Sequence, residues 1–209
     1  MSKKFLKNQI LIYSLLLMIL ASFSGCKRSN NLSDLETTYL HPIYIINMSN
    51  PEEVVGLATN VFIGYIEEII DTSYNYSIPY THYNVKVINN IKGELPLDSV
   101  IEINKEGGIS KDQSRYILHE NDTLPNVDEY YVFNVIQTIE DNSYVASGIN
   151  MIVPLDDINI DSIVEEINVD STTTNIEKNI DIKEELENSG IYNKYLEAFK
   201  NQIEYDPNK

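Results

Sequence analysis

The sequence of 209 residues contains one cysteine, Cys26, and no tryptophan. A single thiol cannot form a disulfide within the chain or supply a thiolate cluster for a metal, so the fold depends on its apolar core. Basic residues are also few, with 15 Lys and Arg against 32 Asp and Glu and a net charge of −17. Because this acidity repels phosphate groups, nucleic acid is excluded as an expected partner.

Long hydrophobic runs are scarce as well. The most apolar stretch, residues 10–21, is 12 residues long, whereas a membrane-spanning helix needs about 20. Lys3, Lys4 and Lys7 precede it, and the small residues Ser24 and Gly25 follow it. A basic segment, a short apolar run and small residues are typical of a secretory signal peptide. An uncleaved N-terminal anchor helix is the alternative.

The segment Ser22-Phe23-Ser24-Gly25-Cys26 resembles the lipobox of bacterial lipoprotein signal peptides, although Phe23 stands where that family more often has an aliphatic residue. The resemblance implies that residues 1–25 are removed and that Cys26 becomes a diacylglyceryl cysteine. The chain would then be lipid-anchored to the cell membrane on its extracytoplasmic face. Removal of three lysines and no acids would leave 184 residues with a net charge of −20.

Composition divides the rest of the chain into three parts. Residues 26–37 are polar and predict a flexible tether, residues 38–156 predict a β domain with one short helix before it, and residues 157–209 predict an acidic helical appendage. The short helix should begin after Asn50, because Asn50 can cap it and Pro51 suits the first helical position.

Residues 80–91 give the clearest strand signal. Thr81, Tyr83 and Val85 alternate with His82 and Asn84, which predicts a strand with one buried face. Residues 61–66 predict a buried strand in which Gly64 indicates a bulge or a close backbone approach, and residues 71–79 predict a polar loop. Further strands are expected at 100–103, near 116–118, at 130–139, at 144–148 and at 151–154.

The C-terminal part shows helical periodicity. Residues 160–167 predict a helix and residues 170–179 a linker. Residues 183–203 place Tyr192, Tyr195, Leu196, Phe199 and Ile203 on one stripe, and Gly190 divides this region into what can be two shorter helices.

The layout Val61-Phe62-Ile63-Gly64, Tyr83-Asn84-Val85-Lys86-Val87, Ile91-Lys92-Gly93-Glu94, Gly107-Gly108 and Tyr130-Tyr131-Val132-Phe133 resembles that of small secreted β-barrels. It is similar to uncharacterised bacterial lipoproteins and, more distantly, to the OB-like barrels of netrin-type and metalloproteinase-inhibitor modules. The resemblance implies a mainly β fold, an OB-like barrel of five or six strands; a sandwich of the same strands is the alternative. The inhibitors' activity is not carried over, because it depends on an N-terminal cysteine that disulfides hold in place, and Cys26 has no partner cysteine.

No catalytic motif is present. Gly108-Ile109-Ser110 lacks the second glycine of a nucleophile elbow. His41, His82 and His119 are isolated in sequence, and His119 and Glu120, as neighbours on a strand, should point to opposite faces. Solvated loop histidines are expected, and a histidine paired with a carboxylate across the barrel is the alternative. Residues 157–168 resemble the opening of a calcium loop but have Ser162 where glycine is required, so neither a metal nor a cofactor is expected.

We therefore expect a non-catalytic binding or scaffolding module, with a basic peptide or protein as its partner. Tyr74, Tyr76, Tyr80 and Tyr83 are the expected ligand contacts, because tyrosine combines apolar area with a hydroxyl group. The alternative is a small membrane-anchored hydrolase that uses histidine and carboxylate residues.

The lipid anchor is directly testable. Cys26→Ala should abolish fatty-acid labelling and leave an unprocessed precursor of higher mass, because the thiol that accepts the lipid is gone. Two acyl chains give stable attachment, since each buried CH₂ contributes about 0.8 kcal/mol. Metabolic labelling and intact-mass measurement of the wild type and the variant test this. Unlabelled wild-type protein in the medium would contradict it.

Overall fold

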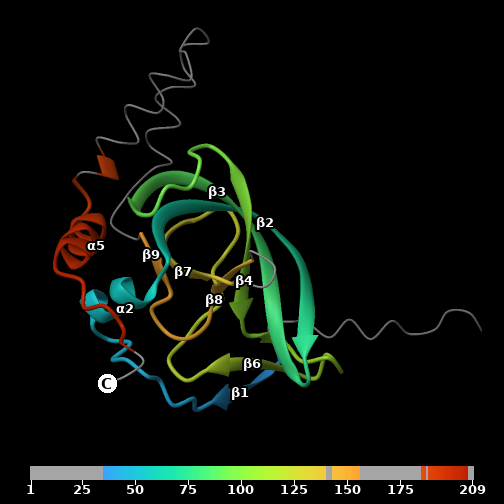
Figure 1. The fold of residues 1–209 in the computed structure, drawn as a ribbon. Helices are drawn as coiled ribbons and strands as arrows, with labels where there is room; N and C mark the ends of the chain where they lie inside the picture. The colour runs from blue at the N-terminus through green and yellow to red at the C-terminus, as the bar shows by residue number, and fades with distance from the viewer. Residues whose placement is uncertain (1–34, 140–142, 156–184, 187, 207–209) are drawn as a thin grey trace, which may run out of the picture. The chain divides into compact units, whose positions relative to one another are not determined.

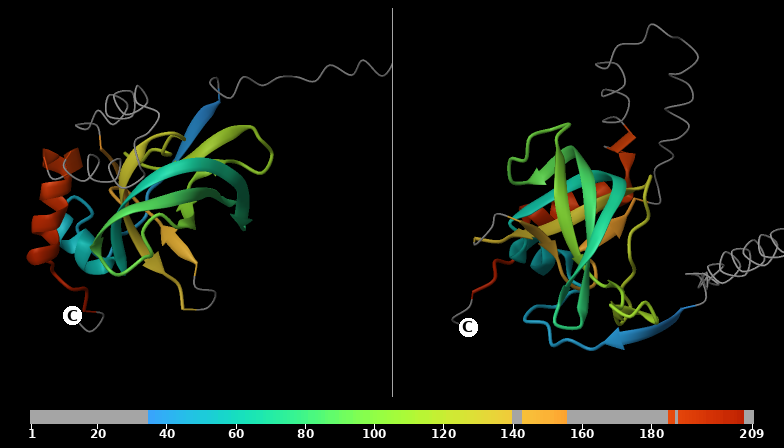
Figure 2. Two further views of the ribbon diagram at one scale, coloured as in Figure 1. Left: turned by 90° about the horizontal axis from the view of Figure 1, so that it is seen from above. Right: turned by 90° about the vertical axis from the view of Figure 1, so that its right-hand side faces the viewer.

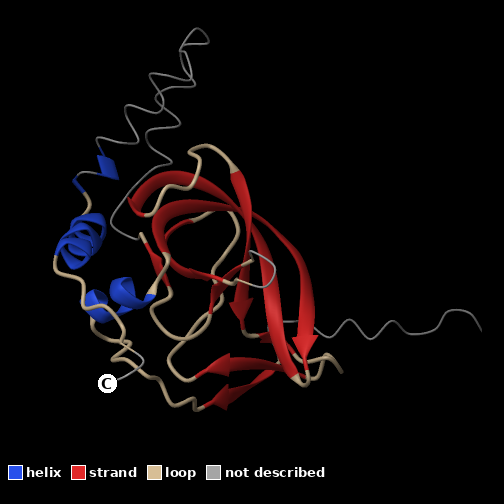
Figure 3. Cartoon of the chain, in the orientation of Figure 1, coloured by secondary structure: helices blue, strands red, loops and turns tan. Residues whose placement is uncertain are grey.

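A six-stranded sheet that closes on itself forms the centre of the computed structural model, which describes residues 35–139, 143–155, 185–186 and 188–206 (Figures 1 and 3). The strand order is β2-β3-β4-β8-β7-β9, and β2 also pairs with β7. All pairings in this sheet are antiparallel except the short β4–β8 pairing. The strands are β2 (Asn60–Asn75), β3 (Ile78–Lys92), β4 (Val100–Glu106), β7 (Tyr130–Gln137), β8 (Tyr144–Ala146) and β9 (Ile152–Pro154). The expected mainly β fold is confirmed.

The alternation predicted for residues 80–91 is confirmed in β3. Thr81, Tyr83 and Val85 are buried, and His82 and Asn84 lie partly exposed on the other face. Tyr83 and Val85 belong to the core cluster enclosed by the ring of strands, together with Phe62, Ile66, Val87, Ile103, Phe133 and Val135. The stacked rings of Phe62 and Phe133, with centroids 5.1 Å apart, bridge β2 and β7 inside this core.

The loop predicted for residues 71–79 is wrong. β2 continues to Asn75, and Asn75 pairs with Ile78, so Tyr76 and Ser77 alone make the turn. Tyr76 has φ +55°, which is the left-handed region that tight hairpin turns require. The segment is polar, and its backbone hydrogen bonds as a strand come from pairing with β3. The result is a long hairpin (Figure 2).

A second, three-stranded sheet has the order β1-β6-β5, with β1 (Glu36–Leu40), β5 (Gly108–Ile109) and β6 (Arg115–His119). The strand expected near residues 116–118 is therefore present as β6. The predicted tether, in contrast, ends earlier than residue 37, because Glu36 and Thr37 pair in parallel with Arg115 and Tyr116.

The short helix expected after Asn50 is α2 (Pro51–Leu57). The Asn50 side chain accepts a hydrogen bond from the amide of Glu52, and Glu53 Oε2 accepts one from the amide of Asn47. At the other end of the helix, the Lys92 ammonium donates to the carbonyl of Val55 over 2.7 Å. Burial lowers the pKa of Lys92, and the negative charge of Glu204 opposes this shift.

Helix α5 (Gly190–Lys200) lies beside α2 (Figures 1 and 2). It begins at the predicted break, where the Ser189 hydroxyl accepts from the amide of Tyr192 over 3.0 Å. Tyr192 and Tyr195 are buried against a second core cluster outside the ring, which includes Val55, Val61, Ile63, Ile91, Val132 and Leu155. The predicted stripe is thus confirmed except at Ile203, which follows the helix and is half-exposed.

The signal segment, Cys26 and the calcium-like residues 157–168 lie outside the described residues, as does the expected helix at 160–167. Within the described ranges, no helix has the length and apolar character needed to span a membrane.

Gly64 allows the close approach that its position in a buried strand predicted. A Cβ atom at this position would lie 2.5 Å from a methyl carbon of Val85 and 2.8 Å from the ring of Phe133. Gly64→Ala should therefore lower the free energy of unfolding by about 1–3 kcal/mol through overpacking. Urea unfolding measures this, with the exposed Ile69→Ala as the control, expected to change stability by less than about 0.5 kcal/mol. Equal stability of the two variants would refute the close approach.

Candidate functional site

Three neighbouring strands carry a polar surface on their outward faces. Ser73 of β2 pairs with Tyr80 of β3, Asp71 pairs with His82, and His82 pairs in turn with Asn104 of β4. Directly paired residues share a face of a sheet. The burial of Thr81 and Tyr83 inside the ring therefore directs these polar side chains outward.

Ser73, His82 and Glu102 form a continuous hydrogen-bonded chain on this surface. His82 Nε2 lies 2.7 Å from Ser73 Oγ, and His82 Nδ1 lies 2.7 Å from Glu102 Oε1. The side chain of His82 is only 16% exposed, whereas that of Glu102 is 54% exposed. The imidazole is thus held between a hydroxyl group and a carboxylate, each bound to a different ring nitrogen. We call these three residues the outer triad.

Carboxylates surround the outer triad. Asp71 Oδ1 lies 3.9 Å from His82 Nε2, and Glu68 accepts a hydrogen bond from the Asn84 side-chain amide over 2.7 Å. The nearest positive charge along β3 belongs to Lys86, which pairs with Asp98 over 3.0 Å. Within the described part of the chain, no three His, Cys, Asp or Glu side chains are grouped so that they could hold a metal ion.

The four tyrosines expected at a ligand site do not form one platform. Tyr83 is fully buried in the core, so it cannot contact a ligand at the surface, because its strand position faces the ring interior. Tyr80 shares the outward face with Ser73. Tyr74 donates a hydrogen bond to the carbonyl of Ile109 over 3.1 Å, and Tyr76 stands in the turn.

In the distal part of the β2–β3 hairpin, residues 67–80, the two strands pair with each other but not with β7 or β4. The β2–β7 pairing ends at Tyr65, and the β3–β4 pairing begins at Thr81. Between these points the hairpin exposes Ile69 by 50%, Ile70 by 45% and Tyr76 by 96%. Glu67, Glu68 and Asp71 are exposed on the same segment. The hairpin arm, as we call residues 67–80, therefore combines apolar and acidic side chains at the surface.

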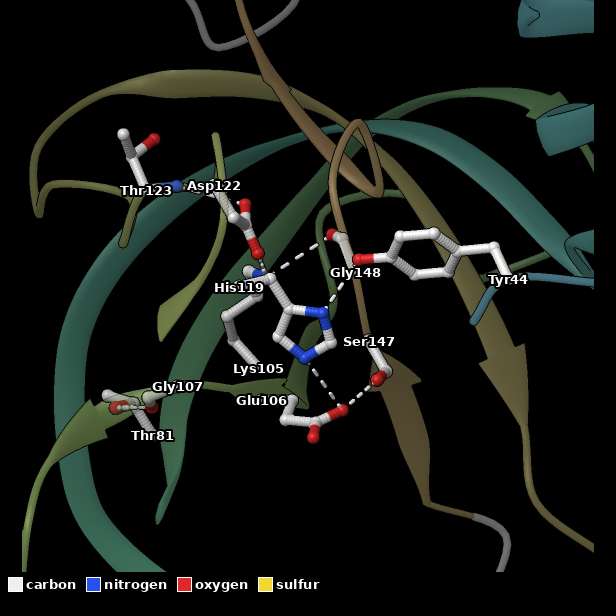
Figure 4. A network of polar contacts seen from close by, with 10 residues as sticks. All are labelled: Tyr44, Thr81, Lys105, Glu106, Gly107, His119, Asp122, Thr123, Ser147 and Gly148. Atoms are coloured by element: carbon white, nitrogen blue, oxygen red, sulfur yellow. Dashed lines mark hydrogen bonds and ion pairs between the residues drawn. The ribbon is translucent and has the colours of Figure 1, made fainter. Parts of the chain in front are cut away.

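A buried ion pair lies at one end of the ring interior (Figure 4). Lys105 occupies an inward-facing position of β4, and its ammonium contacts Asp122, with side-chain exposures of 1% and 7%. The same ammonium lies 3.4 Å from the carbonyl oxygen of Gly148. An unpaired charge at this depth is costly, so Asp122 is what allows lysine at a core position.

His119 of β6 contacts two other segments directly and a third through Glu106 (Figure 4). Its Nδ1 lies 2.7 Å from the Tyr44 hydroxyl, and its Nε2 lies 3.3 Å from Glu106 Oε2. The Ser147 hydroxyl also donates to Glu106. The contact with His119 and the hydrogen bond from Ser147 hold the pKa of Glu106 below its usual value, although burial opposes them.

These contacts correct the expectation for the histidines. His119 is buried and paired with Glu106, and His82 is paired with Glu102, so neither is a solvated loop residue. The expectation that His119 and Glu120 point apart is confirmed, because Glu120 instead contacts the exposed His41 over 2.9 Å. The cluster around His119 is enclosed and joins four chain segments, which indicates a structural role. The outer triad is open to solvent and is the better candidate for chemistry.

A hollow of about 500 Å³ is lined by no residue of the outer triad, but it borders the buried ion pair, because the amide of its lining residue Thr123 donates to Asp122 Oδ1 over 2.9 Å. Its walls combine apolar and polar residues: Thr123, Leu124, Pro125, Asn126, Glu129, Tyr131, Ile152 and Pro154. Comparison of the sequence with models of known protein families gives no match, and comparison with curated proteins gives none either.

The buried ion pair makes a sharp prediction for stability. Lys105→Met should lower the free energy of unfolding by about 3–5 kcal/mol, because it leaves the Asp122 carboxylate buried without its partner. Lys105→Met combined with Asp122→Leu should recover much of that loss. Urea unfolding of both variants tests this, with the exposed Lys111→Met as the control. A Lys105→Met variant as stable as the control would contradict the pairing.

Proposed function

We propose that this chain is a lipid-anchored, extracytoplasmic binding module whose partner is a basic, partly apolar peptide or protein. The lipobox-like residues that end at Cys26 support the anchor and the location. The observation that supports the binding role is that the hairpin arm exposes apolar and acidic side chains together.

An OB-like barrel is the architecture we propose for the closed sheet. Five strands form the ring β2-β3-β4-β8-β7, and its one parallel pair joins β4 to β8. Such a ring fits a five-stranded, partly open Greek-key barrel. In OB folds the second and third strands and the loop between the first two strands bind ligands. Here those parts correspond to β3, β4 and the turn at Tyr76 and Ser77.

The chemistry of the arm favours a cationic partner. Glu67, Glu68 and Asp71 attract Lys or Arg side chains, and the acidity of the whole chain steers such ligands toward it. Tyr76, almost fully exposed, offers its ring for a cation–π contact of about 0.5–1 kcal/mol. Ile69 and Ile70 give apolar area that a purely polar surface lacks. The partner is therefore both basic and amphipathic.

Binding should weaken as salt increases, because screening acts on exposed charges. A basic amphipathic peptide should bind more tightly than an acidic peptide of equal length and equal apolar content.

Ile70→Ser combined with Tyr76→Ser should lower the affinity for the basic peptide about 10-fold, which corresponds to about 1.4 kcal/mol. Fluorescence anisotropy between low and physiological salt measures both effects on the full-length protein.

Leu97→Ser is the matched control, since Leu97 is 58% exposed but lies in the β3–β4 connection away from the arm. It should leave the affinity unchanged. Equal affinity for the basic and acidic peptides, or no dependence on salt, would show that the acidity serves solubility alone and would refute the proposed partner.

A further inference from the structure

We infer that the outer triad is an acyl-transfer site, in which Ser73 is the nucleophile, His82 the general base and Glu102 the residue that positions His82. The substrate class is small activated esters that can reach an open surface. This inference goes beyond the proposed binding role and does not depend on it.

The two hydrogen bonds of His82 define its chemistry. An ionised carboxylate only accepts hydrogen bonds, so the contact with Glu102 places a proton on Nδ1. In the neutral ring, Nε2 then carries a lone pair, and this is the atom that lies 2.7 Å from Ser73 Oγ. A hydroxyl, an imidazole and a carboxylate joined through opposite ring nitrogens are the arrangement that activates a serine.

The fold holds these groups in place. Each stands on a different strand of one sheet, and the strand that carries His82 is anchored by Thr81 and Tyr83, which are buried on its other face. The β2–β3 register shifts between Ile69 and Asp71. Such an irregularity re-aims the side chains that follow it. Sites built on strands keep their geometry better than sites on mobile loops.

The surroundings suit an open-site reaction. Ser73 is exposed, so an ester can approach it, and Tyr80 stands directly opposite on the same face. The second carboxylate, Asp71, lies 3.9 Å from Nε2, beyond hydrogen-bond distance, and leaves that nitrogen to Ser73.

The reaction balances without a cofactor. Ser73 Oγ forms a bond to the ester carbonyl carbon while His82 Nε2 accepts the hydroxyl proton. The bond to the alcohol then breaks, and the alcohol leaves with that proton. Water attacks the acyl–serine in the same way, which releases the acid and restores the Ser73 hydroxyl.

A fluorophosphonate probe tests the nucleophile directly, because Ser73 Oγ would displace fluoride from phosphorus and retain the phosphonyl group. The full-length protein in mild detergent should gain one phosphonyl mass, located on Ser73 by peptide mapping. Ser73→Ala and His82→Ala should each lower the labelling rate by at least about 100-fold, the usual scale of general base catalysis. Circular dichroism should show both variants folded, since neither side chain belongs to the core.

The chain offers two matched controls. Ser114 is an exposed serine whose hydroxyl lies 2.8 Å from Asp112, a carboxylate, and it contacts no imidazole of the described residues. His41 is an exposed histidine paired with a carboxylate, Glu120, and it contacts no serine in the described part of the chain. Ser114→Ala and His41→Ala should label as the wild type does.

The positioning role of Glu102 needs a kinetic readout. With 4-nitrophenyl acetate, Glu102→Gln should lower kcat about 10-fold or more and leave KM unchanged, because only the orientation of His82 is lost. Labelling of the wild type at no more than the level of Ser114, or labelling of Ser73 that persists in His82→Ala, would overturn the inference.

Discussion

The structure depends on the pairing of β2 along both of its edges. Between Val61 and Tyr65, β2 pairs with β3 on one side and with β7 on the other. This double pairing closes the sheet, and closure requires a residue without a side chain at Gly64, where Val85 and Phe133 come closest. Beyond Tyr65 the second partner is lost. The same strand therefore builds the core at its start and the hairpin arm at its end.

Closure separates two polar environments that the chain uses differently. Inward-facing positions hold Lys105, which is neutralised by Asp122, and a replacement there acts on stability. Outward-facing positions hold the outer triad, whose members contact solvent as well as one another. Because the residues of β3 and β4 alternate between the two faces, a shift of one residue in register would exchange these environments.

Prediction from the sequence succeeded where the pattern was local. The alternation of Thr81 with His82 gave β3 its two faces, and Asn50 with Pro51 marked the start of α2. It failed at residues 71–79, where polar and turn-forming residues predicted a loop, whereas pairing with β3 makes this segment part of a hairpin. Because of that error, the outer triad was not predicted. A turn at Tyr76 and Ser77 pairs Ser73 with Tyr80 and Asp71 with His82. All four residues then lie on the outward face of the hairpin.

The sequence by itself determined which segments have a buried face, because side-chain periodicity follows from backbone geometry within one element. It also determined that no disulfide can support the fold, since Cys26 has no partner. Only the tertiary structure decided which charges meet. Lys105 and Asp122 are 17 residues apart, Ser73 and Glu102 belong to different strands, and His119 meets Tyr44 across 75 residues. Such contacts arise from the order and register of strands, which local patterns do not specify.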